Sequence, residues 1–98
     1  MEHREIQRVA APICERFRVR TLDLFGSRAS GDAQAGSDFD FCVSFDDLPP
    51  VEYSRCFFGL LHDLEDAFQH RVDLLTHESI RKQALRKSIE KQGIRIYG

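Results

Sequence analysis

The chain has 98 residues, of which 42% are hydrophobic and 31% are charged, and its formal net charge is −2. This length predicts a single domain over 1–98, because domains usually hold about 100–150 residues, and the mixed composition excludes a disordered chain. The sequence lacks both the basic excess that binds long nucleic acid and any apolar run near the roughly 20 residues of a membrane span.

The cysteines and the N-terminus favour a cytoplasmic location. The three cysteines are odd in number and include no Cys-x-x-Cys pair, so neither a disulfide framework nor a zinc site is indicated. Charged residues near the N-terminus occupy the place where a signal peptide would need an apolar stretch. We therefore expect a soluble cytoplasmic protein.

The first half of the chain reads as a helix followed by a strand and a turn. Apolar residues recur at helical spacing over 3–16, which predicts an amphipathic helix. Residues 19–25 alternate as a strand does, and Gly26 ends that strand. We expect one short helical turn near Ser27, and then a loop up to residue 37 in which turn-forming residues are common.

The second half predicts two more helices and three strands. A strand is expected over 39–45 and a long amphipathic helix over about 51–69, after two prolines that break the chain. A third strand follows over 71–75, then a helix over 78–91 and a short strand over 94–96. This order favours an α+β fold with a small sheet backed by helices. The pattern leaves the polarity of the strands open.

Two aspartates on alternate positions of the second strand are the first candidate site. Asp38 and Asp40 would project from the same face, roughly 6.5–7 Å apart along the strand. Two like charges so placed repel each other, and Mg²⁺ would compensate because it prefers carboxylate oxygens and completes its shell with water and phosphate. The alternative is a solvated edge strand with both aspartates in water.

The Gly26-Ser27 pair that ends the first strand is the second candidate site. Glycine lets a phosphate approach the main chain closely, and serine often begins a helix, whose first N–H groups can bind an anion. Taken alone, Gly-Ser is also common in ordinary turns. Its nearness to an Asp-x-Asp strand favours a nucleotide site.

The two stretches 24–31 and 36–43 together resemble the minimal nucleotidyltransferase (MNT) domains of the DNA polymerase β superfamily. The signature of that family is Gly-Ser, ten residues, and then Asp-x-Asp, and this chain has the same spacing. Residues 71–76 resemble the strand that carries the third carboxylate of the family. The resemblance covers nearly the whole chain and implies a polymerase β-type nucleotidyltransferase fold with a small mixed sheet.

The resemblance also implies a metal centre. Asp38 and Asp40 would hold two Mg²⁺ ions, while Asp73 would ligate the catalytic ion and accept the proton of the attacking hydroxyl. An aspartate between Val72 and Leu74 would otherwise be an awkward charge on a buried strand, although a salt bridge to a neighbouring arginine could compensate it. Two aspartates upstream on the long helix are alternative third carboxylates; they are Asp63 and Asp66.

By the same resemblance, Gly26 and Ser27 would hold the triphosphate of a nucleotide. Arg28 follows them and is a further candidate for phosphate binding, or else an ordinary surface arginine. The histidines lack the spacing of metal ligands, and we expect them to be solvated; they are His3, His62, His70 and His77.

The function that the resemblance implies is transfer of AMP from ATP to a hydroxyl, with release of pyrophosphate. The expected acceptor is a tyrosine of a HEPN-family ribonuclease toxin, which would make the chain its antitoxin. Two alternatives stay open: an antitoxin that neutralises its partner by docking alone, and a nucleotidyltransferase subunit that acts on another acceptor with a second chain. Modification of the chain's own Tyr53 or Tyr97 is a further alternative.

Overall fold

Four strands form one mixed sheet in the order β3-β2-β1-β4 in the computed structural model, which describes residues 2–31, 38–77, 87 and 92–98. The strands are β1 (Val19–Phe25), β2 (Phe39–Phe45), β3 (Val72–Thr76) and β4 (Ile94–Tyr97). β1 runs antiparallel to both β2 and β4, whereas β2 and β3 are parallel. The expected α+β fold with a mixed sheet is confirmed.

The described helices are α1 (His3–Arg16), α2 (Ser27–Ser30) and α3 (Pro50–Phe68). Their positions confirm the helices and the helical turn expected from the sequence up to residue 77. The further helix expected over 78–91 lies outside the described residues, apart from Lys87. No helix in the described part of the chain is long and apolar enough to cross a membrane.

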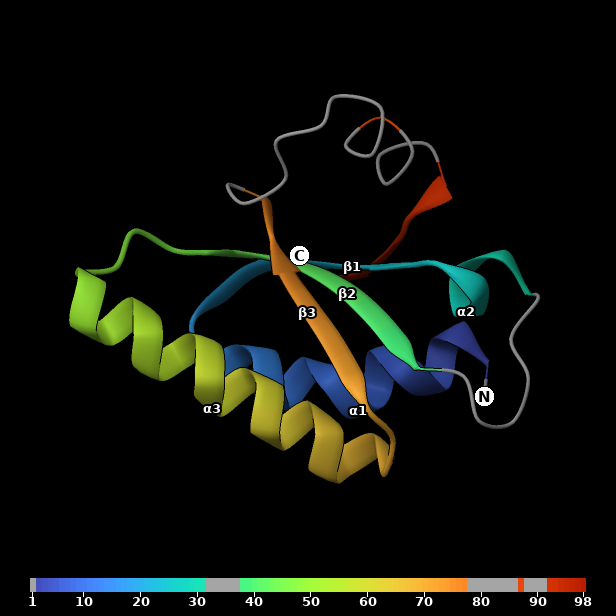
Figure 1. The fold of residues 1–98 in the computed structure, drawn as a ribbon, viewed down its shortest axis with the longest axis horizontal. Coiled ribbons are helices and arrows are strands. Elements are labelled where there is room, and N and C mark those ends of the chain that lie inside the picture. Colours follow the sequence, from blue (N-terminus) through green and yellow to red (C-terminus); the bar gives the residue numbers. More distant parts are fainter. Residues whose placement is uncertain (1, 32–37, 78–86, 88–91) are drawn as a thin grey trace.

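The two long helices, α1 and α3, lie on the same face of the sheet (Figure 1). Apolar side chains of alternate strand residues point toward these helices and are fully buried, as Leu24, Phe39 and Phe41 show. They meet apolar helix residues such as Ile6 and Leu60. This burial is the main favourable contribution to folding.

Side chains of successive strand residues point to opposite faces of the sheet, so those that do not face α1 and α3 lie on the other face. Phe39 and Phe41 turn to the helices, so Asp40 between them turns to the opposite face. In β3, Val72 and Leu74 are buried, so Asp73 likewise turns away from the helices. The face opposite to α1 and α3 therefore carries the acidic residues of both strands.

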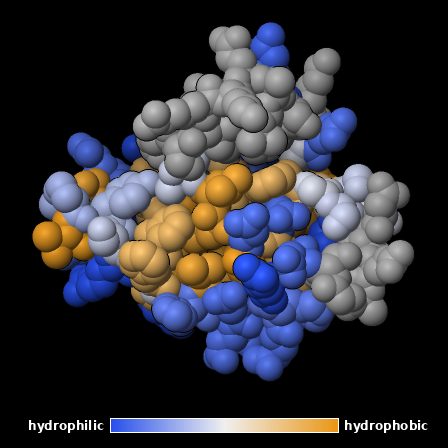
Figure 2. Space-filling model, in the orientation of Figure 1, coloured by the Kyte–Doolittle hydropathy of each residue, from blue (hydrophilic) through white to orange (hydrophobic). Residues whose placement is uncertain are grey.

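Some apolar surface remains exposed on α3. Figure 2 shows apolar side chains at the centre of the viewed face and at its left end, toward the N-terminal half of α3. Val51 and Phe58 are the large hydrophobic residues with the greatest exposure in the described part of the chain, at 82% and 58%.

Candidate active site

The register between β2 and β3 places Asp40 directly beside Asp73. The two residues are Cα partners in the parallel pair, and neighbouring strands lie about 4.8 Å apart. Partners in a parallel pair point to the same face, so both carboxylates lie opposite to the helices. Asp38 directly precedes β2 and is exposed. The structure thus brings the three aspartates to one region of one face.

These carboxylates influence one another electrostatically. The pKa of Asp40 is raised above its usual value, first by partial burial and then by the negative charges of Asp73 and Asp38. Each of these effects disfavours the ionised form of Asp40. A cation bound between the carboxylates would reverse the effect.

The donors suit Mg²⁺ by their chemistry, because Mg²⁺ usually binds one or two protein carboxylates together with substrate phosphates. Within the described residues, however, no three side chains of Asp, Glu, His or Cys are close enough to enclose a metal ion by themselves. Asp40 and Asp73 form the close pair, and Asp38 and Asp73 are both exposed to solvent. This arrangement fits a cation whose remaining ligands come from a substrate and from water.

Gly26 lies against Asp40. Its φ of +74° is in the left-handed region, which residues with a side chain rarely adopt. A Cβ on Gly26 would overlap the carboxylate of Asp40, with only 3.1 Å to Cγ. The carbonyl of Gly26 accepts hydrogen bonds from the N–H groups of Ala29 (3.1 Å) and Ser30 (3.2 Å), which form the turn of α2. Only glycine fits between the end of β1 and Asp40.

Arg28 contacts the core. Its guanidinium carbon lies 3.9 Å from the centroid of the Phe39 ring, a cation–π contact. Phe39 in turn stacks on Phe68 of α3, with 4.6 Å between the ring centroids. This contact directs the guanidinium toward the helix side of the sheet, whereas Asp40 points to the other side.

Asp73 differs from the sequence expectation in its exposure. We expected an awkward charge on a buried strand, but Asp73 is exposed, because β3 is an edge strand and the side chain points away from the helices. The alternative third carboxylate Asp63 lies on α3 and binds Arg16, with 2.6 Å between Nη1 and Oδ2. Asp63 thus serves the packing of α1 against α3.

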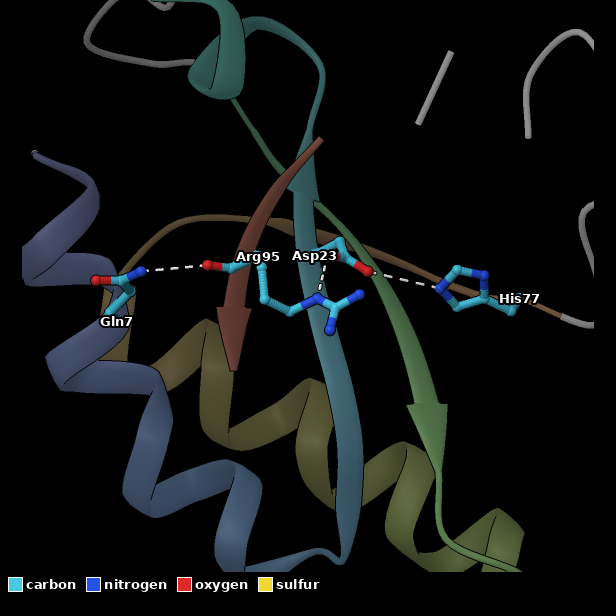
Figure 3. Close-up of polar contacts among 4 residues, drawn as sticks. All are labelled: Gln7, Asp23, His77 and Arg95. Atoms are coloured by element: carbon cyan, nitrogen blue, oxygen red, sulfur yellow. Dashed lines mark hydrogen bonds and ion pairs between the residues drawn. The ribbon is translucent and has the colours of Figure 1, made fainter. Parts of the chain in front are cut away.

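Sequence reasoning missed a polar cluster around Asp23 in β1 (Figure 3). Arg95 Nε donates to Asp23 Oδ1 at 2.6 Å, and His77 Nε2 lies 3.6 Å from Asp23 Oδ2. The main-chain oxygen of Arg95 also accepts a hydrogen bond from Gln7 Nε2 at 3.2 Å. The expectation that all histidines are solvated is therefore wrong for His77, which is partly buried beside a carboxylate. It is also wrong for His3 and His70, which are partly buried with a ring nitrogen at 3.2 Å from the main-chain oxygen of Arg28 and at 2.8 Å from that of Phe68, respectively.

Neither tyrosine is placed to react at this site within the same molecule. Tyr53 packs edge to face on Phe45, with 5.1 Å between the centroids, and Phe45 is five residues past Asp40 in β2, or about 17 Å along the strand. Tyr97 packs against the core between the sheet and the helices. Neither tyrosine therefore lies beside the paired carboxylates.

Comparison with known sequences identifies relatives over most of the chain. A family profile described as Nucleotidyltransferase domain matches residues 6–96. A protein of Methanocaldococcus jannaschii that is named as a candidate protein adenylyltransferase, MJ1379, is 34% identical over 82 residues, or 84% of this chain and 81% of the relative. The protein adenylyltransferase MntA of Thermococcus cleftensis is 33% identical over 82 residues, or 84% of this chain and 79% of MntA.

Solved structures share the fold. A structure described as a candidate minimal nucleotidyltransferase matches with a TM-score of 0.73 and 26% identity, over 96% of this chain and 95% of the matched chain. A toxin–antitoxin crystal structure with AMP-PNP matches with a TM-score of 0.74 and 23% identity, over 94% and 73%. A complex of the tri-AMPylated HEPN toxin of Shewanella oneidensis with an MNT antitoxin matches with a TM-score of 0.68 and 20% identity, over 99% and 73%.

Proposed function

The chain belongs to the nucleotidyltransferase domain family, and on that premise we propose that it transfers AMP from ATP to a hydroxyl of a partner protein. The observation that carries this proposal is the pairing of Asp40 with Asp73 across two parallel strands. Gly26 lies next to this pair, where a Cβ would overlap the Asp40 carboxylate. The relatives named as protein adenylyltransferases support the same reaction.

In the proposed reaction, the acceptor oxygen forms a bond to the α-phosphorus of ATP. The bond between the α-phosphorus and the bridging oxygen to the β-phosphate breaks, and pyrophosphate leaves with that electron pair. Asp73 is the carboxylate that we assign to receive the proton of the acceptor hydroxyl, because it is exposed on an edge strand where a partner can reach it. Mg²⁺ held by Asp38, Asp40 and Asp73 would supply neutralisation of the charge on the triphosphate and the leaving group.

We assign the triphosphate to the end of β1. Gly26 has no side chain, so a phosphate can approach the main chain there without displacing Asp40. Ser27 is the first residue of α2 and adds a hydroxyl at the same place. Arg28 follows directly, and we assign it to phosphate as well; its guanidinium lies over the Phe39 ring.

We further propose that the partner is a HEPN-family toxin, that the acceptor is a tyrosine, and that transfer makes this chain an antitoxin. The support is that matched structures are toxin–antitoxin complexes, one with AMP-PNP and one with an AMPylated HEPN toxin. The site itself agrees, because Asp38 and Asp73 are exposed and both tyrosines of the described chain pack away from the carboxylates.

The test is transfer with purified components. We expect the chain, given ATP, Mg²⁺ and a HEPN-family protein encoded beside it, to add the mass of one or more adenylyl groups to a tyrosine of that protein. The Asp38→Asn, Asp40→Asn double variant should add none while still binding the partner. Absence of any mass increment with the unaltered chain would overturn the enzymatic proposal.

A second candidate is neutralisation by docking alone. The observation in its favour is that, within the described residues, the carboxylates do not by themselves enclose a metal ion. A protection assay in cells that express the toxin distinguishes the two candidate functions. Full protection by the Asp38→Asn, Asp40→Asn double variant would favour docking, and loss of protection would favour catalysis.

A further inference from the structure

The short helix α2, which carries Ser27 and Arg28, has little buried surface of its own to hold it in place. It has four residues, and none of them is fully buried, although Ala29 packs against the core. A single helical turn is not stable in isolation, because its few hydrogen bonds do not offset the entropy lost in fixing its backbone. Contacts from other elements must therefore hold α2 beside Gly26 and Asp40.

Residues outside α2 hold Arg28 at both ends. Its main-chain oxygen lies 3.2 Å from Nε2 of His3, in the first turn of α1. A carbonyl oxygen can only accept a hydrogen bond, so Nε2 of His3 carries a proton and is the donor. At the other end, the guanidinium of Arg28 lies over the ring of Phe39. The N-terminal end of α1 and α2 thus lie side by side (Figure 1).

Gln7 makes the same kind of contact one turn further along α1. Its Nε2 donates to the main-chain oxygen of Arg95 in β4, also at 3.2 Å (Figure 3). Each contact is one hydrogen bond from a side chain of α1 to a main-chain oxygen. Gln7 therefore fastens β4 to α1, whereas His3 fastens the turn that follows β1. Only the second of these segments is assigned to the nucleotide.

We propose that His3 is a positioning residue for nucleotide binding. This inference rests on the proposed function, in which Gly26 and Ser27 hold the triphosphate. Through the main-chain oxygen of Arg28, His3 fixes the position of α2 relative to Asp40. Binding of ATP then costs less free energy, because the turn is ordered before the nucleotide arrives. In this role His3 touches neither the nucleotide nor the metal and acts only through Arg28.

The first test compares His3→Leu with Gln7→Leu and measures the dissociation constant of a non-hydrolysable ATP analogue in the presence of Mg²⁺. Each variant loses one hydrogen bond from α1 and keeps a residue that favours helix. We expect His3→Leu to raise the dissociation constant about three- to tenfold, as expected for the loss of one hydrogen bond. Gln7→Leu should leave it unchanged. His3→Gln should recover most of the affinity, because glutamine keeps a donor of similar reach.

The transfer reaction gives a second readout of the same role. His3→Leu should raise the KM for ATP and leave the KM for the acceptor protein unchanged, because the turn is assigned to the triphosphate alone. Gln7→Leu should change neither constant.

Amide hydrogen exchange without nucleotide tests the positioning itself. The N–H groups of Ala29 and Ser30 donate to the carbonyl of Gly26, so their protection reports whether the turn is formed. We expect His3→Leu to speed the exchange of both groups about three- to tenfold, while Gln7→Leu leaves it unchanged. His3→Gln should restore the slow exchange. This measurement needs neither ATP nor a partner protein.

The outcomes separate this inference from the proposed function. An unaltered chain that binds the ATP analogue but transfers no AMP would overturn the proposed transfer, and the effect of His3→Leu on binding would still decide the role of His3. Equal affinity of His3→Leu and the unaltered chain would overturn that role and leave the proposed transfer intact. Absence of analogue binding by the unaltered chain would overturn both.

Two further results would show that His3 has only a structural role. The first is a lower melting temperature of His3→Leu with unchanged affinity and unchanged exchange, which would mean that His3 only fastens the start of α1. The second is an equal loss of affinity in His3→Leu and Gln7→Leu, which would reflect a general loss of stability and not the position of α2.

Discussion

Asp40 and Asp73 are direct neighbours across the parallel strands β2 and β3, and both point away from the helices that cover the opposite face. Two like charges at paired positions of a sheet destabilise the fold, by roughly 0.2–1 kcal/mol in comparable strand pairs. The pair therefore carries a cost in stability that a cation bound between the two carboxylates would offset.

Removal of one charge should therefore stabilise the chain when no metal is present. We expect Asp73→Asn to raise the free energy of unfolding in the presence of EDTA by roughly 0.2–1 kcal/mol, while it abolishes transfer. Urea denaturation measures the first effect. Asp66→Asn, on the exposed side of α3, is the matched control and should leave both properties unchanged. A less stable Asp73→Asn variant would show that Asp73 has a structural partner.

Gly26 and Gly31 offer a matched pair of substitutions. Both have positive φ, at +74° and +87°, but a Cβ on Gly26 would overlap the Asp40 carboxylate, whereas a Cβ on Gly31 would meet nothing within 4 Å. Alanine at either position should cost about 1–2 kcal/mol of stability through backbone strain. Only Gly26→Ala should also displace Asp40, and a displacement of about 1 Å can lower kcat/KM by about a hundredfold.

Equal losses of activity in the two alanine variants would contradict this account. Kinetics of transfer and thermal melting, measured on both proteins, distinguish the effect on Asp40 from the shared effect of strain.

The raised pKa of Asp40 predicts how stability depends on pH in the absence of metal. The folded chain holds the proton of Asp40 to higher pH than the unfolded chain does, so its contribution to stability is complete below the usual aspartate pKa. That contribution is lost as the pH rises through the raised pKa. The difference in free energy of unfolding between the unaltered chain and Asp40→Asn should therefore fall with rising pH over this window. A difference that rises with pH would mean that a cationic group, not burial and like charge, dominates around Asp40.

Binding of Mg²⁺ with ATP should stabilise the folded chain, because a ligand that binds only the folded state adds to the free energy of unfolding. The gain is about 2.7 kcal/mol when the ligand concentration is a hundredfold above its dissociation constant. Thermal melting with Mg²⁺ and a non-hydrolysable ATP analogue measures this gain. Asp38→Asn and Asp40→Asn should each reduce it, and an undiminished gain in both variants would place the metal elsewhere.

The sequence alone predicted the order and type of the described elements, because hydrophobic periodicity records which face of each element is buried. The helix over 3–16 and the strands over 19–25 and 39–45 have the same bounds in the structure. Periodicity does not record which strands pair or in which direction. The family resemblance therefore implied that Asp40 and Asp73 lie close together. The register of β2 and β3 in the structure shows that they are direct neighbours.

The cluster around Asp23 shows what pattern reasoning could not reach. An aspartate between the buried Leu22 and Leu24 is unusual for a strand and could have marked a paired charge. Its partner Arg95 is 72 residues away in the sequence and comes to it only through the antiparallel pairing of β1 and β4. The exposure of Asp73 likewise depends on β3 being an edge strand, which no local pattern contains.

The most direct test of the central claim follows the label from ATP. The chain and the proposed HEPN-family partner are incubated with Mg²⁺ and ATP radiolabelled either at the α-phosphate or at the γ-phosphate. We predict that the partner retains the α label, that the γ label leaves as pyrophosphate, and that the Asp38→Asn, Asp40→Asn double variant transfers neither. A partner that retains no label, or that retains the γ label, would contradict adenylyl transfer by this chain.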